Sequence, residues 1–127
     1  MIEALFNQPN YQAVKKFLDV TALRHDALAS NLANLETPGY KRIDLAAGFD
    51  TELRQAFAAQ DGTTFAGLRP RLEVDLTART QGRDGNTVQL ESELMKLNQN
   101  SLEHTLETQL VTSSLLKLRH AITGRAA

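Results

Sequence analysis

Apolar residues recur at alternating spacings of three and four near both ends of the chain, a pattern typical of a helix that packs along another helix. The first segment runs from Tyr11 to Leu35, and the second runs from Leu90 to Ile122 without interruption. We predict a mainly α protein whose two long terminal helices form an antiparallel coiled-coil-like hairpin. The predicted hairpin seam consists of Val14, Leu18, Leu28, Leu32, Leu90, Leu94, Leu97, Val111, Leu115 and Leu118.

The ends of both helices carry capping signals. Asn7 or Asn10 is a suitable cap for the first helix, and Asn86 or Thr87 for the second. Pro38 cannot continue a helix, so the first helix must end before it.

The middle of the chain has a different pattern. Apolar residues four apart predict a short helix over Phe49–Gln60, and glycines then punctuate a loop-rich stretch. Alternation over Leu68–Leu76 predicts one extended strand that has no partner of its own in this chain. We therefore divide the chain into an N-terminal helix (1–38), a loop-rich middle (39–86) and a C-terminal helix (87–127).

A second apolar stripe follows the C-terminal helix on the side opposite the seam, at about 100° per residue. One partner helix can cover only one of the two stripes, and an uncovered stripe forgoes about 1.5–3 kcal/mol per large side chain. We therefore expect a second subunit to cover the other stripe. The residues predicted to pack between subunits are Met95, Leu102, Leu106 and Leu110.

Both seams have polar centres. Thr21 and His25 interrupt the first seam, and Ser101 and His104 interrupt the second. In an antiparallel hairpin Thr21 falls near His104 and His25 near Ser101, which would form a polar layer that fixes the register of the helices. The alternative is that these groups face solvent or a wet cavity.

Composition and residue spacing argue against nucleic-acid binding, metal binding and catalysis. The net charge is −1, which gives no field for nucleic acid, and there is no cysteine. His25, His104 and His120 are too scattered for a metal site, and Glu91 and Glu93 suit the start of a helix better than a catalytic pair. We expect no enzyme activity, cofactor or small-molecule substrate.

The sequence also lacks the patterns of a membrane span and of a cleaved signal peptide. No apolar run reaches the roughly 18 residues that a membrane span requires. The first six residues include Glu3 and no basic flank, so we expect no cleaved signal peptide.

The segment from Ala29 to Lys41 carries the most specific motif. A helix with two asparagines three apart runs into Thr-Pro-Gly-Tyr, where proline presets φ, glycine accepts a positive φ and the tyrosine can anchor the turn against the helix. This motif resembles the signature of bacterial flagellar rod and hook proteins. Its residues are Asn31, Asn34, Thr37, Pro38, Gly39 and Tyr40.

Other features are most similar to the proximal rod subunit of the flagellar basal body. The chain is short, and the opening of the C-terminal helix, Gly85–Met95, fits that subunit except that Gln89 stands where an aspartate is expected. The resemblance is weakest from about Gln60 to Arg83.

The resemblance implies a structural rod component of the periplasmic basal body, exported uncleaved by the flagellar type III apparatus. It implies other rod proteins, the rod–ring adaptor and the inner-membrane ring as partners, and terminal helices that become ordered on assembly. The competing interpretation is a soluble coiled-coil adaptor or secretion chaperone that binds one partner through the same stripe.

Overall fold

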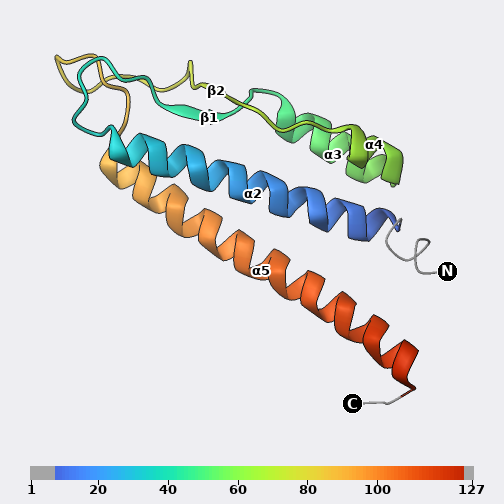
Figure 1. The fold of residues 1–127 in the computed structure, drawn as a ribbon. Helices are drawn as coiled ribbons and strands as arrows, with labels where there is room; N and C mark the ends of the chain where they lie inside the picture. The colour runs from blue at the N-terminus through green and yellow to red at the C-terminus, as the bar shows by residue number, and fades with distance from the viewer. Residues whose placement is uncertain (1–7, 125–127) are drawn as a thin grey trace.

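The computed structural model describes residues 8–124 and is mainly helical, with one small sheet. Three layers lie side by side, with the N-terminal helix between the middle segment and the C-terminal helix (Figure 1). The elements are α2 (Pro9–Ala33), β1 (Ile43–Leu45), α3 (Phe49–Ala59), α4 (Gly62–Gly67), β2 (Leu72–Val74) and α5 (Leu90–Thr123).

The hydrophobic core lies between α2 and the middle segment rather than between the two long helices. Ala13 and Val20 of α2 are buried against aromatic and aliphatic side chains of α3 and α4. Phe49 and Phe65, each at most 2% exposed, are the largest side chains in this core. The 11-residue α3 matches the predicted short helix, with Gln60 as its C-cap.

Two predictions for the middle segment were wrong. Gly62 and Gly67, interpreted as loop punctuation, are the first and last residues of α4, which is capped when the Asp61 side chain accepts from the backbone of Thr63. The predicted strand also has a partner in this chain. Only Leu72–Val74 is a strand, and it pairs antiparallel with β1.

The predicted caps of the long helices were also wrong. Asn10 lies inside α2, which begins at Pro9, while Asn7 lies outside the described residues. Proline suits the first turn of a helix because its missing N–H would have no partner there. Gln89 precedes α5 as its N-cap, and Asn86 and Thr87 bind other parts of the chain.

Helices α2 and α5 run antiparallel, because Asn31 bonds to Glu93 while Thr21, earlier in α2, bonds to Glu107. The two helices separate toward the N-terminus of α2 and the C-terminus of α5 (Figure 1). A continuous coiled coil is not confirmed. Three predicted seam residues, Leu90, Leu94 and Leu115, are more than two-fifths exposed.

Helix α5 contributes almost nothing apolar to the interior. Of its 34 residues, only Glu93 and Asn100 are fully buried within the described chain. A helix with this many leucines is stable in water chiefly when its apolar faces are covered. The separate chain therefore leaves most of the apolar surface of α5 uncovered.

Candidate functional site

The Thr37–Tyr40 segment of the sequence motif is a tight turn. The backbone N–H of Tyr40 donates to the carbonyl of Thr37 at 3.2 Å, and Gly39 has φ +74°. Pro38 before a glycine with positive φ is the arrangement of a type II turn. The predicted turn is confirmed, although α2 already ends at Ala33.

Asn31 joins α2 to the strand that follows the turn. Its side-chain amide donates to the carbonyl of Ile43 at 2.9 Å, and its side-chain oxygen accepts from the N–H of Ile43 at 3.0 Å. The amide nitrogen also lies 3.1 Å from Oε2 of Glu93 in α5. Asn31 is completely buried, so each of these bonds replaces hydration that the side chain has lost.

Tyr40 anchors the turn against α2, as the motif predicted. Its hydroxyl lies 3.1 Å from Oγ of Ser30 and 3.4 Å from Oδ1 of Asn31. Asn34 closes the end of the helix by donating to the carbonyl of Ser30 at 2.8 Å and accepting from the Thr37 hydroxyl at 3.2 Å. The polar motif residues therefore bind one another and the helix end.

Asn86, shortly before α5, is the residue that sequence reasoning placed in the wrong role. Its side-chain nitrogen lies 2.9 Å from the carbonyl oxygens of Asn34, Leu35 and Thr37. Asn34 is the C-cap of α2, and Leu35 and Thr37 follow it, so these carbonyls lie just beyond the last turn, where the helix itself supplies no partner. Asn86 thus caps the end of the other long helix.

Hydrogen bonds from the backbone and from one side chain hold the turn against the segment before α5. The N–H of Gly39 donates to the carbonyl of Asp84 at 2.8 Å, and Nζ of Lys41 donates to the carbonyl of Gly85 at 2.9 Å. A Cβ on Gly85, which has φ +75°, would meet Cα of Gly39 at 3.8 Å. That distance is an ordinary contact, so these two glycines are favoured by their positive φ rather than by lack of space.

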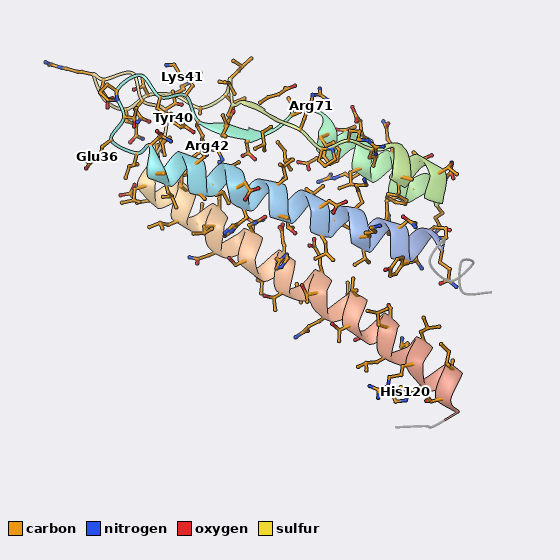
Figure 2. All side chains as sticks on the ribbon, in the orientation of Figure 1. Glu36, Tyr40, Lys41, Arg42, Arg71 and His120 are labelled. Carbon is orange, nitrogen blue, oxygen red and sulfur yellow. The ribbon has the colours of Figure 1, made fainter. Side chains whose placement is uncertain are left out.

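Arg42 is buried where the turn, the sheet and α5 meet. Its guanidinium bonds to Asp75 at 2.6 Å, to Asp44 at 2.7 Å and to Glu93 of α5. Figure 2 shows Tyr40, Lys41 and Arg42 grouped at the end of the molecule where α2 leads into the turn. This cluster joins three segments that are distant in the sequence.

The charged groups of the cluster stabilise one another in their ionised forms. Burial alone would lower the pKa of Arg42, but hydrogen bonds to Glu93 and Asp44 outweigh it and raise the pKa. Burial alone would raise the pKa of Asp75, but hydrogen bonds from Thr77 and the charge of Arg42 lower it. Both shifts favour the charged pair that holds the junction.

Sequence reasoning missed this cluster. Glu93 was interpreted as a partner of the helix dipole, like Glu91, yet Glu93 is 0% exposed whereas Glu91 is exposed. Arg42 has no periodic signal, since its partners Asp75 and Glu93 lie 33 and 51 residues away. The one available cue was that Arg42 directly follows the motif.

The polar layer between α2 and α5 is only partly as predicted. Oγ1 of Thr21 lies 3.4 Å from Nδ1 of His104 and donates to Glu107 at 2.8 Å. Asn100 adds a 2.9 Å bond from its side-chain nitrogen to the Thr21 carbonyl. His25, expected in the same layer, is exposed.

Glu107 is the titratable group most affected by this layer. Burial raises its pKa, the nearby charge of Glu103 raises it further, and the hydrogen bond from Thr21 only partly offsets the increase. The side-chain oxygen of Asn100 is buried without a hydrogen-bond partner in the described part of the chain. The centre of the α2–α5 contact is therefore polar and imperfectly satisfied.

The outer stripe of α5 lies on the surface. Its four members are each more than half exposed in the separate chain, and a side chain of that size forgoes about 1.5–3 kcal/mol when it is left in water. These residues are Met95, Leu102, Leu106 and Leu110.

No group of three or more metal-ligating side chains occurs among residues 8–124. In that range no helix has the length and apolar content needed to cross a bilayer. His120 lies near the end of α5, far from the motif in Figure 2.

The fold and the site define a mainly helical protein in which a turn motif fastens two long helices together and one helix stays largely uncovered. Residues 19–41, which include the motif, match the family model described as flagella basal body rod protein. The chain is 34% identical to flagellar basal body rod protein FlgB of Aquifex aeolicus (strain VF5), over 88% of this chain and 91% of that protein.

Two further relatives carry the same description. FlgB of Aeromonas hydrophila is 32% identical over 84% of this chain and 87% of its own length. FlgB of Escherichia coli (strain K12) is 28% identical over 77% of this chain and 81% of its own length. The chain belongs to the FlgB family of flagellar basal body rod proteins.

Proposed function

We propose that this chain is a structural subunit of the proximal rod that assembles by burying both apolar faces of α5. The inner face, in this account, packs along α2 as a coiled-coil-like hairpin, and the outer stripe packs against neighbouring subunits. The observation that carries the proposal is that no apolar residue of α5 is fully buried within the described chain. Burial of the stripe on assembly supplies the driving force.

The junction gives each part of the chain a role in this assembly. Residues 1–38 and 87–127 form the axial core, and residues 39–86 brace it. Support comes from Arg42 and Asn86, whose side chains bond across the boundaries between these parts. The bonds set the angle at which α5 leaves the junction, while the remainder of α5 is left for partners.

The partners follow from the family relationship. We expect other rod proteins, the rod–ring adaptor and the inner-membrane ring to cover α5, in the periplasmic basal body and after uncleaved export by the flagellar type III apparatus. The polar contact around Thr21 and Asn100 supports this order of events. A weak contact between the helices keeps α5 available for export and assembly.

A closed complex with one partner, as in an adaptor or secretion chaperone, is the less favoured account. It would saturate at fixed stoichiometry, whereas a rod subunit uses several faces with several neighbours. The three relatives reported above, each of which matches more than three-quarters of this chain, are described as rod proteins.

The test replaces the four stripe residues of α5 with serine in a strain that lacks the native subunit. The isolated variant should keep its helicity and unfolding temperature, because these side chains are exposed, but it should be missing from purified basal bodies. Normal incorporation would reject the proposal. The control replaces Thr105, Thr108 and Thr112 with alanine, since their hydroxyls bond only to carbonyls of α5 itself.

A further inference from the structure

A polar pocket of about 180 Å³ lies where α2, β1 and α5 meet. One of its lining residues, Asn100, is only 3% exposed. The side-chain nitrogen of Asn100 donates to the Thr21 carbonyl at 2.9 Å, but its side-chain oxygen has no hydrogen-bond partner among the described residues. A buried oxygen without a partner costs free energy, so we expect the pocket to supply a donor. The lining residues are Arg24, Asp44, Lys96, Gln99, Asn100 and Glu103.

Arg24 lines the same pocket and makes only long contacts there. Its guanidinium lies 3.8 Å from Asp44, 3.7 Å from Asp50 and 3.8 Å from Glu103. All three distances are longer than a direct hydrogen bond, although the Arg24 side chain is only 26% exposed. A polar contact across more than about 3.5 Å is one that a bridging water molecule can complete. Arg24 therefore needs an acceptor, whereas Asn100 needs a donor.

The occupant of the pocket has to accept hydrogen bonds on one side and donate them on the other. A metal cation offers no acceptor, and the charges of Arg24 and Lys96 would repel it. An anion would be repelled by the carboxylates of Asp44 and Glu103. Water both accepts and donates, and at about 30 Å³ for each molecule the pocket has room for more than one.

We propose that this pocket is a binding site for ordered water, which accepts from Arg24 and donates to Asn100. Further water molecules complete the long ion pairs of Arg24 with Asp44 and Glu103. Such bridges are nearly as favourable in enthalpy as direct hydrogen bonds. The site lies within one chain and needs no assembly partner.

The water site gives α5 a second attachment of a different kind. Glu93 and Asn100 are the two fully buried residues of α5 in the described chain, and about two helical turns separate them. Arg42 bonds directly to Glu93, whereas water joins Asn100 to Arg24. Separation of the helices at Asn100 exchanges bound water for bulk water. This attachment therefore opens more easily than the one at Glu93.

A crystal structure of the chain that resolves ordered water tests the geometry. We expect a water oxygen within hydrogen-bond distance of both the side-chain oxygen of Asn100 and a guanidinium nitrogen of Arg24. A direct bond to Asn100 from Arg24 or from the Lys96 ammonium would overturn the proposal. An ion at that position, or no density beside the Asn100 oxygen, would overturn it as well.

Lys96→Met is the matched variant for a test in solution. Lys96 lies one helical turn before Asn100 on the same face of α5, so its ammonium is the chain's own alternative donor. Magnetisation transfer from water to the side-chain amide of Asn100 should show water that tumbles with the protein, equally in the parent and in Lys96→Met. The exposed amide of Asn98 should report only bulk water. Loss of the Asn100 signal in Lys96→Met, or a signal no stronger than that of Asn98, would contradict the water site.

Discussion

Glu93 of α5 is fully buried and accepts a hydrogen bond from Nε of Arg42, which lies directly after the turn motif. The pair connects the start of α5 to the segment that follows the turn. Breaking such a pair is costly because the remaining charge is left buried and uncompensated. The contact therefore makes the attachment of α5 specific even though the helix buries no apolar side chain fully within the described chain.

Replacing Arg42 with glutamine should destabilise the junction most strongly. Glu93 would be left buried with only Asn31 as a partner, so we expect the free energy of unfolding to fall by about 3–5 kcal/mol. Urea unfolding followed by circular dichroism measures the change. Arg71→Gln is the matched control, since Arg71 pairs with Glu73 on the surface and should cost less than about 1 kcal/mol. Equal stability of the two variants would contradict this role for Arg42.

Gly39→Ala should destabilise the turn through its backbone alone. A Cβ there meets nothing within 4 Å, but φ is +74°, a conformation that costs a residue with a Cβ about 1–2 kcal/mol. Gly67→Ala is the control. That glycine lies in α4 with nothing within 4 Å and no positive φ, so alanine should be neutral or slightly stabilising. Thermal unfolding of both variants checks the difference, and a neutral Gly39→Ala would refute the strained turn.

Asn86→Ala should loosen the end of α2. The variant loses the donor to three backbone carbonyls, and we expect a loss of about 1–3 kcal/mol in unfolding free energy. Hydrogen exchange should increase first near residues 34–37. Asn98→Ala, at an exposed position of α5, serves as the comparison and should leave that region unchanged. Similar exchange in both variants would argue against the capping role.

Glu107 should make the α2–α5 contact more stable at acid pH. Because its pKa is raised, the folded chain binds the proton more tightly than the unfolded chain. The stabilisation builds as pH falls through the raised value and is complete below the ordinary value of 4.5. Glu107→Gln should therefore be more stable than the parent at neutral pH and equal to it below that value.

Unfolding temperatures across the pH range measure this difference, with Glu91→Gln as an exposed control. The comparison is limited to pH values at which Asp75 remains ionised. Its pKa is lowered from 3.8, so its contribution is lost as pH falls through that lower value. A constant difference between Glu107→Gln and the parent would show that Glu107 is not perturbed by the contact.

The periodic parts of the sequence predicted the elements well. The three-four spacing predicted α2 and α5 to within two residues at each end, and the motif predicted the turn and the contact of Tyr40 with the helix. Both depend on local geometry, which a sequence records directly. The apolar stripe of α5 could be predicted from the sequence for the same reason.

The packing between distant segments was not predictable in the same way. The pairing of β2 with β1, the core formed with Phe65 and the partners of Arg42 all depend on how the middle segment folds back onto α2. No local spacing encodes these contacts. Glu93 and Asn86 were misassigned because a helix start usually faces solvent, whereas here it docks onto another helix end.

The most direct test of the central claim places a photoactivatable cross-linker at Leu106 of α5 and compares intact basal bodies with the isolated chain. We expect a cross-link to a neighbouring subunit in basal bodies, none in dilute isolated protein, and only a weak product from Thr112, an exposed position on another face of α5. If the outer stripe is equally unreactive in assembled basal bodies, α5 is not covered by neighbours and the account is wrong.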